Sequence, residues 1–315
     1  MFNTLTRMGS SGAADYEIER SIRFNRGDDP YFSKQPSSAG NRRTFTISVW
    51  VKRSNTGSIG ALFYAGTSVG GNHNDTDAFL FNASDQLNFA GEENQVAKYN
   101  IVTNRKFRDP SAWYHIVLAV DTTQGTASNR IKLYVNGVQE TSFATETYMS
   151  QNYELFINST VAGGSTNGNI HVVGYTGSAR DLDGYMADFH LIDGQQLTPA
   201  SFGETNEATG QWVPIDTSGL TFGTNGIHLN FSDNSGTSAT TLGKDSSGNG
   251  NNFTPNNFSV AAGVGNDSLT DTPTNNFSTL NPIQEHGTNF ATISNGNLEA
   301  SLSSTTHHAH SSIAM

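Results

Sequence analysis

The residues Ala112-Trp-Tyr-His-Ile-Val-Leu-Ala-Val-Asp121, followed by Arg130-Ile-Lys-Leu-Tyr-Val-Asn-Gly137, decide the fold class of this 315-residue chain. In the first run, successive side chains point to opposite faces, and both faces carry apolar residues. This period of two predicts a strand that is buried on both sides. The second run ends in Asn136-Gly137, the dipeptide that best supplies the positive φ angles of a tight hairpin turn. We therefore predict two neighbouring antiparallel strands.

Short strands separated by turn residues recur on both sides of this pair. The run Thr44-Phe-Thr-Ile-Ser-Val-Trp-Val-Lys52 alternates strictly, with Phe45, Ile47, Val49 and Val51 on one face. Further strands are predicted at residues 21–25, 61–65, 78–82, 86–90, 97–103, 153–158, 170–174 and 184–192. No helical periodicity interrupts them. The pattern is typical of an all-β fold, an antiparallel β-sandwich.

Composition excludes several classes of partner. Lys and Arg number 17 against 28 Asp and Glu, which gives a net charge of −11 at pH 7. This acidic balance argues against nucleic acid, which needs a basic face for its phosphates, and against an anionic membrane surface. The chain has no Cys, so neither a disulfide nor a thiolate metal site can form. It also shows no signal peptide and no transmembrane run.

The texture of the sequence divides the chain into four segments. Residues 1–19 hold few core-forming side chains and are predicted to form a flexible N-terminal arm, and residues 20–195 hold the strands of the sandwich. Residues 196–290 are rich in Asn, Gly, Ser and Thr. This composition predicts an extended segment that either packs on the sandwich or links away from it. Residues 291–315 have the pattern of a second β domain that begins there, as in a longer polypeptide.

Six further passages of the chain recur, in the same order, in one family of proteins. They are Arg20-Ser-Ile-Arg-Phe-Asn25, Arg43-Thr-Phe-Thr-Ile-Ser-Val-Trp-Val-Lys-Arg53, Phe107-Arg-Asp-Pro-Ser-Ala-Trp-Tyr-His-Ile-Val117, Asp183-Gly-Tyr-Met-Ala-Asp-Phe-His-Leu-Ile-Asp-Gly-Gln195, Gly243-Lys-Asp-Ser-Ser-Gly-Asn-Gly-Asn-Asn252 and Asp271-Thr-Pro-Thr-Asn-Asn276. Together with the opening hairpin, these passages resemble virion proteins of marine bacteriophages that carry laminin-G-like domains of the concanavalin A-like lectin/glucanase type. The resemblance runs from near residue 20 to the end of the chain.

The resemblance implies a laminin-G-like jelly roll on a virion that is assembled in the cytoplasm of a bacterial host. It implies a tail-fibre, head-fibre or receptor-binding appendage with a lectin-like adhesion module. The alternative is a capsid decoration protein that binds the major capsid protein. Expected partners are other virion proteins (portal, tail adaptor or capsid), a host surface glycan, and further copies of the chain, as a trimer if the protein is a fibre.

Three carboxylates are candidate ligands for Ca²⁺. Asp75 and Asp77 end a Gly-rich loop and Asp85 follows, and hard oxygen ligands clustered in this way can bind calcium. The spacing does not match an EF-hand, so a solvated loop is the simpler interpretation. Residues 181–184 and 307–310 also combine metal-binding residue types, but a turn and an exposed polar tract explain them more simply. We expect no other cofactor.

No arrangement typical of catalysis is found in the sequence. Glucanases of this fold use carboxylates spaced along one strand as acid and nucleophile. Glu92 and Glu93 are adjacent, so on a strand they face opposite ways. Asp188 and His190 share one face of a strand that the resemblance makes structural. A glycan-degrading enzyme is therefore the least favoured of the three functions, and we expect no enzymatic activity.

Aromatic side chains are the remaining candidates for a binding surface, because Tyr and Trp stack on sugar faces and anchor protein interfaces. The candidates for ligand or interface contacts are Trp50, Tyr64, Tyr99, Tyr148 and Tyr153. Trp50 lies on the more polar face of its strand, and the tyrosines lie near predicted strand ends. The alternative, that most of them cap the core, stays open.

Overall fold

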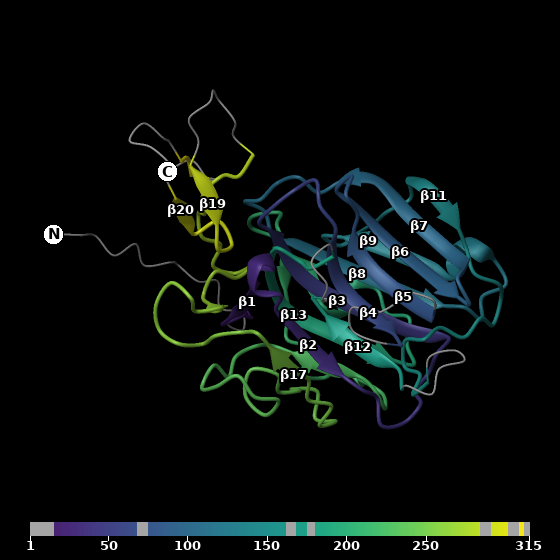
Figure 1. Ribbon diagram of the computed structural model, residues 1–315. Helices are drawn as coiled ribbons and strands as arrows, with labels where there is room; N and C mark the ends of the chain where they lie inside the picture. Colours follow the sequence, from purple (N-terminus) through teal and green to yellow (C-terminus); the bar gives the residue numbers. More distant parts are fainter. Residues whose placement is uncertain are drawn as a thin grey trace.

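The chain folds into two antiparallel sheets that pack face to face (Figure 1). The computed structural model describes residues 16–67, 75–161, 168–174, 180–283, 291–301 and 309–311. The predicted all-β sandwich is confirmed. No helix in these ranges is long and apolar enough to cross a membrane.

Sheet 1 contains the two strands predicted at residues 112–121 and 130–136. In spatial order it contains β10 (Val138–Gln139), β9 (Ile131–Val135), β8 (Tyr114–Asp121), β3 (Thr44–Arg53), β13 (Gly184–Asp193), β1 (Ser21–Phe24) and β18 (Ser268–Leu269), and β16 (Ile227–Leu229) also pairs with β13. The predicted turn joins β9 to β10, and its residues Asn136 and Gly137 have φ angles of 47° and 79°. Positive φ at both positions is the geometry that a two-residue hairpin requires.

Sheet 2 faces sheet 1 across the core and also has eight strands. In spatial order they are β11 (Phe143–Thr147), β7 (Val96–Lys106), β6 (Gln86–Glu93), β5 (Asp75–Phe81), β4 (Gly60–Gly66), β12 (Ile170–Val173), β2 (Tyr31–Lys34) and β17 (Thr254–Asn256). The short elements outside the two sheets are the pair β14 (Gly203–Thr205) and β15 (Trp212–Pro214), the pair β19 (Thr292–Ser294) and β20 (Glu299–Ser301), and the 3₁₀ turns η1 (Arg26–Asp28), η2 (Ala127–Asn129) and η3 (Pro199–Ser201).

The core between the sheets is made by the apolar face of each strand. The four predicted core residues of β3, Phe45, Ile47, Val49 and Val51, lie in it without solvent exposure. The opposite face of β8 is also buried, because Val117 packs in a second apolar cluster outside the core. Both expectations from the alternating pattern are therefore confirmed, since β8 is buried on its two faces.

The strand predicted at residues 153–158 is wrong. These residues run as an irregular loop that carries no β-ladder. Phe156 and Ile157 donate their backbone N–H groups to Asp77 Oδ2, at 2.6 and 2.9 Å, instead of to a neighbouring strand. A buried side chain here takes over the hydrogen bonds that a β-ladder would supply.

The chain after residue 196 packs on the sandwich and adds strands to both sheets. β16 and β18 join sheet 1, and β17 joins sheet 2. Residues 257–283, which we call the strap, are held by two buried ion pairs: Arg23 to Asp267 at 2.9 Å and Lys52 to Asp271 at 2.9 Å. The hairpin of β19 and β20 lies beyond the strap, at the upper left of Figure 1.

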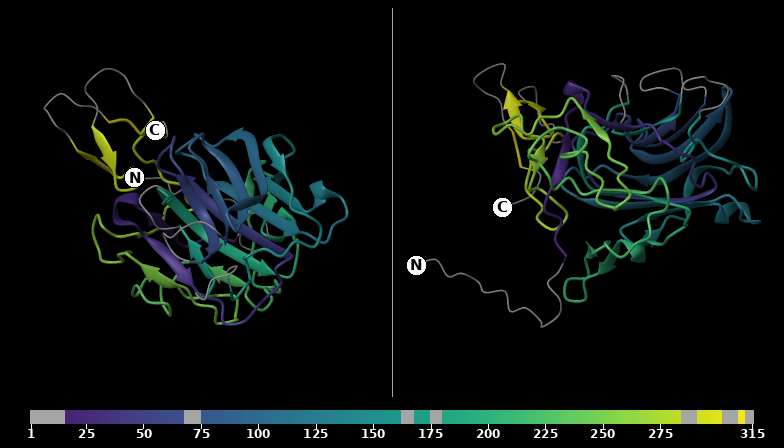
Figure 2. Two further views of the ribbon diagram at one scale, coloured as in Figure 1. Left: turned by 45° about the vertical axis from the view of Figure 1, so that its right-hand side comes forward. Right: turned by 90° about the horizontal axis from the view of Figure 1, so that it is seen from below.

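Two segments that are remote in sequence cover the outer face of sheet 1, the face turned away from sheet 2. Phe202 and Phe222 pack on the β8 and β13 side chains of the second apolar cluster, and Tyr16 and Ile18 pack beside Trp50. Figure 2 shows the green segment that contains β14 and β15 on this side of the sandwich. A polar site lies beneath this cover.

Candidate functional site

A β-bulge in the middle of β13 positions the acidic residue of the site. The register with β3 passes from Ala187↔Trp50 to His190↔Ser48, so three steps along β13 oppose two along β3. The extra residue is Asp188, whose φ of 51° lies in the left-handed region. A bulge lets two successive side chains turn to the same side of a sheet. Asp188 and His190 therefore both reach the outer face, where they meet β16.

Asp188, His190 and His228 form a compact buried cluster. His228 Nε2 lies 2.5 Å from Asp188 Oδ1, and His190 Nε2 lies 3.9 Å from Asp188 Oδ2 and 3.0 Å from Thr217 Oγ1. Burial lowers the pKa of His190 to about 3, so its ring is neutral at pH 7. Burial opposes the ionisation of Asp188, but the hydrogen bond with His228 helps to hold its pKa below the ordinary value. The carboxyl group is therefore ionised.

The cluster is the one group of three metal-capable side chains found in the described part of the chain. Its ring geometry does not fit a metal ion. The two imidazole rings stack with centroids 4.2 Å apart and an interplanar angle of 16°. A metal ion binds a histidine nitrogen in the plane of its ring, and it cannot lie in two nearly parallel, separated planes at once. As arranged, the cluster is a hydrogen-bonded network that fixes Asp188.

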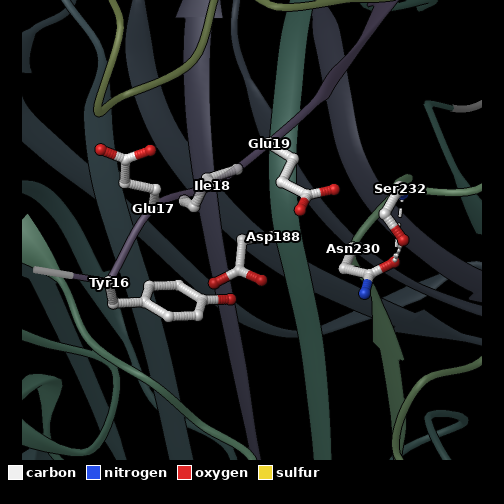
Figure 3. Close-up of a pocket in the computed structure, with 7 residues that line it drawn as sticks. All are labelled: Tyr16, Glu17, Ile18, Glu19, Asp188, Asn230 and Ser232. Carbon is white, nitrogen blue, oxygen red and sulfur yellow. Dashed lines mark hydrogen bonds between the residues drawn. The ribbon is translucent and has the colours of Figure 1, made fainter. Parts of the chain in front are cut away.

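A polar pocket of about 220 Å³ opens beside Asp188. Residues 16–19 line one side, and Asn230 and Ser232, just after β16, line the other. Figure 3 shows the Tyr16 hydroxyl and the Glu19 side chain on either side of the Asp188 carboxylate. Burial, and then the charge of Asp188, raises the pKa of the Tyr16 hydroxyl, which keeps its proton as a donor. The predicted arm thus contributes its last four residues to this pocket, and residues 1–15 lie outside the described ranges.

A second histidine network lies next to the pocket on the same face. Trp212 Nε1 donates to His115 Nδ1 at 2.9 Å, so the ring proton is on Nε2, which donates to Ser48 Oγ at 2.9 Å. The Trp50 ring stacks on His115 with centroids 4.8 Å apart. Burial lowers the pKa of His115 to about 3. This ring is a neutral bridge between β3, β8 and β15, with no nitrogen left for a ligand.

The three calcium candidates do not share a site. Asp77 Oδ1 accepts from Tyr99 at 2.7 Å, and Asp75 Oδ1 accepts the backbone N–H of Asn94 at 2.9 Å. Asp85 lies in the turn at the far end of β5. There it pairs with Arg53 and Arg108 at 3.0 and 2.7 Å. Each carboxylate therefore has protein donors of its own.

The candidate aromatic residues divide into buried and half-buried groups. Trp50, Tyr64 and Tyr99 are 4%, 2% and 1% exposed, so they pack within the fold. Tyr148 and Tyr153 are half-buried and pack against the core. Trp50, Tyr64 and Tyr99 therefore present no surface on which a sugar could stack, and they pack as structural residues instead.

The two remaining candidate stretches lie apart from the pocket. Asp181 and Asp183 precede β13, and burial raises the pKa of Asp181 to about 7. His307 and His308 lie outside the described residues, and His310 is exposed. Neither stretch joins the cluster of three metal-capable side chains.

The sequence reasoning noted Asp188 and His190 on one strand and missed the site they build. Its other members are residues 16–19, His228 and the residues just after β16, and no local pattern links these segments to β13. One signal was available. The apolar residues of β13 switch phase, from Met186 to Phe189 and Leu191, and a switch of phase indicates a bulge.

Comparisons with solved structures find distant similarity in sequence. A native heptameric SAP-like pentraxin from Limulus polyphemus is 15% identical over 58% of this chain and 80% of its own, with a TM-score of 0.40. A putative carbohydrate-binding protein from Bacteroides ovatus is 15% identical over 76% of this chain and 59% of its own, with a TM-score of 0.47. The CBM40 of the Ruminococcus gnavus IT-sialidase, solved with α2,3 sialyllactose, is 16% identical over 49% of this chain and 89% of its own, with a TM-score of 0.33.

A family model gives the firmer assignment. No curated protein matches the chain significantly. The model of a laminin-G family, described as the concanavalin A-like lectin/glucanases superfamily, matches residues 26–201. This match covers more than half of the chain and contains β9, β8, β3 and β13, four neighbouring strands of sheet 1. The chain belongs to the laminin-G branch of the concanavalin A-like lectin/glucanases superfamily.

Proposed function

We propose that this chain is a non-catalytic, lectin-like adhesion module of a phage virion, carried on a tail fibre, head fibre or other receptor-binding appendage. Membership of a lectin-type family supports glycan binding. The resemblance of the six quoted passages to marine-phage virion proteins supports the particle, its assembly in the host cytoplasm, and contacts with other virion proteins. A symmetric homo-oligomer, a trimer for a fibre, fits this role.

The observation that carries binding over hydrolysis is the protonation pattern of the carboxyl groups. A glycosidase needs an acid whose pKa is raised beside a second, ionised carboxylate. In the described ranges, burial raises the pKa of Asp77, Asp181, Asp183 and Asp267. None of these four lines the pocket, where Asp188 is ionised. This arrangement supports a pocket that holds a ligand without cleaving it.

A capsid decoration protein is the second candidate, and exposed apolar side chains favour it. Among the described residues seven large apolar side chains are exposed, and four of them lie between residues 264 and 298. These four are Val264, Phe277, Ile283 and Leu298. Where exposed apolar side chains form one contiguous patch, the patch is typical of a protein interface. A decoration protein would use such a surface on its capsid partner.

A glycan array with the labelled full chain, and immunogold labelling of intact particles, test the proposal together. We expect binding to a subset of glycans, gold on the tail or on head fibres, and an oligomer by light scattering. Gold spread over the capsid shell with no glycan binding would favour decoration instead. Release of reducing sugar from a bound glycan would contradict a non-catalytic module.

A further inference from the structure

We propose that the pocket beside Asp188 recognises the free ammonium group of an unacetylated amino sugar, with Asp188 and Glu19 as the groups that contact the charge. This inference rests on the proposed glycan-binding function and names the class of sugar. It concerns a pocket on the outer face of sheet 1, built from residues 16–19, Asp188, Asn230 and Ser232.

Asp188 is one of the buried carboxylates that no lysine or arginine in the described part of the chain neutralises, unlike Asp85, Asp267 and Asp271. Asp267 and Asp271 pair with Arg23 and Lys52, and Asp85 pairs with two arginines. Within the described ranges no lysine or arginine forms an ion pair with Asp188, although its side chain is only 2% exposed. An ionised carboxylate that is hydrogen-bonded at one oxygen can gain a further charge-assisted hydrogen bond from a cationic ligand at the other.

One oxygen of Asp188 is left for a ligand. His228 occupies Oδ1 at 2.5 Å. In the part of the chain that the structure describes, no group donates a hydrogen bond to Oδ2, whose neighbour His190 Nε2 lies 3.9 Å away. Figure 3 shows the carboxylate between the Tyr16 hydroxyl and Glu19. Because Asp188 lines the pocket, an ammonium group could approach this acceptor there.

The remaining lining matches the other parts of an amino sugar. The Tyr16 ring offers an apolar face, Ser232 and Asn230 offer polar groups for hydroxyls, and the volume of about 220 Å³ suits one sugar ring. Glu17 and Glu19 add negative charge at the same place. These carboxylates, on a chain of net charge −11, repel anionic sugars and attract cations.

A metal ion is the competing cation, and the geometry opposes it. The stacked rings of His190 and His228 cannot bind one ion together. The carboxylates of Glu17, Glu19 and Asp188 do not converge into a group of metal-ligating distance, since the cluster with such distances contains Asp188 and the two histidines. An ammonium group needs only two or three separate acceptors, which the pocket supplies.

Calorimetric titration of the full chain with a glucosamine tetrasaccharide, and with its fully N-acetylated counterpart, tests the inference. We expect the free amine to bind at least tenfold more tightly, with an affinity that falls as salt is added. Asp188→Asn should weaken binding of the free amine at least tenfold, and Glu19→Gln several-fold. Asn tolerates the left-handed backbone of position 188, so this variant keeps the bulge. Glu207→Gln, in the exposed loop between β14 and β15, is the matched control and should bind like the wild type.

Equal affinity for the two tetrasaccharides, or unchanged binding by Asp188→Asn and Glu19→Gln, would overturn the inference. The proposed function would still stand in that case if the chain binds other glycans on the array. Equal binding of Nα-acetyl-lysine methylamide would overturn the assignment to a sugar. If Ca²⁺ alone raises the melting temperature and Asp188→Asn abolishes this rise, the pocket binds a metal ion and the assignment to an ammonium group is overturned. If no glycan on the array binds but the glucosamine tetrasaccharide does, the pocket stands and the wider adhesion function fails.

Discussion

Replacing Asp271 with Asn removes the counter-charge of a buried ammonium group. Lys52 Nζ lies 2.9 Å from Asp271 Oδ2, and the two side chains are 1% and 5% exposed. At this separation two unit charges attract by about 6 kcal/mol if the effective dielectric constant is about 20. The loss is smaller than this, because Asn276 Oδ1 and Phe277 O still accept from the ammonium, at 2.9 and 2.7 Å. We expect the free energy of unfolding to fall by about 3–5 kcal/mol, as for other buried pairs that lose one partner.

Urea unfolding at pH 7, followed by tryptophan fluorescence, measures this loss. Trp113 Nε1 donates to Asp271 Oδ1 at 3.2 Å, so its emission also reports on the region around the pair. The double variant Lys52→Met/Asp271→Asn should regain at least half of the stability, because neither charge then stays buried without a partner. The control is Lys98→Met, which breaks the Lys98–Glu93 pair of sheet 2, where the atoms lie 3.3 Å apart and the side chains are 33% and 38% exposed.

The control variant should lose less than about 1 kcal/mol, the usual limit for an exposed pair. A similar small loss for Asp271→Asn would refute the reasoning, because the ammonium would then not depend on its counter-charge. Equally damaging would be a double variant whose loss equals the sum of the single losses, since additivity means that the two side chains do not interact.

Three further predictions concern other parts of the fold. Burial raises the pKa of Asp77 to about 6, above the value of about 4 for an unfolded Asp, so ionisation of Asp77 lowers the stability of the wild type as the pH rises from about 4 to 6. The free energy of unfolding of Asp77→Asn, measured with urea and relative to the wild type, should therefore be more favourable at pH 8 than at pH 5 by about 1 kcal/mol. An equal difference at both pH values would contradict this. Phe189→Ala removes a fully buried ring that stacks on Phe63, with ring centroids 5.8 Å apart. We expect the free energy of unfolding to fall by about 3–5 kcal/mol in the same assay. A fall of under about 1 kcal/mol would mean that the surrounding side chains collapse into the cavity. Gly137→Ala places a Cβ 2.5 Å from the Trp212 ring, at a position whose φ is 79°. The melting temperature should fall by several degrees, as expected for a cost of at least about 1 kcal/mol. An unchanged melting temperature would show that both the turn and Trp212 can adjust.

The strands could be predicted from the sequence because each depends on a local property. Alternation places Phe45 and Val51 in the core whatever lies opposite them, and Asn136-Gly137 forms its turn from the φ preferences of two residues. The prediction of a strand at residues 153–158 was wrong because it also depended on a local property alone. Its alternation was real, but the partner of its backbone is Asp77, 79 and 80 positions earlier in the chain.

The pocket could not be predicted, because it depends on which strands become neighbours. Asp188 and His228 are 40 positions apart, and they meet because β16 pairs with the second half of β13. Residues 16–19 reach the same place because β1 pairs with the first half of β13. Periodicity states which face of a strand is apolar. It does not state the order of strands in the sheet, and the order brings these groups together.

The bulge at Asp188 explains how a charged residue can lie in the middle of a buried strand. If alternation continued unbroken from the core residue Met186, then Asp188 and His190 would enter the core, and Phe189 and Leu191 would leave it. One extra residue restores Phe189 and Leu191 to the core and turns Asp188 and His190 outward. A glycine would adopt the φ of 51° without penalty, and Asp and Asn are the residues with a side chain that adopt this conformation most readily. Asp188 combines the bulge, a buried charge and the wall of a pocket, so a ligand is expected there before any other part of the described surface.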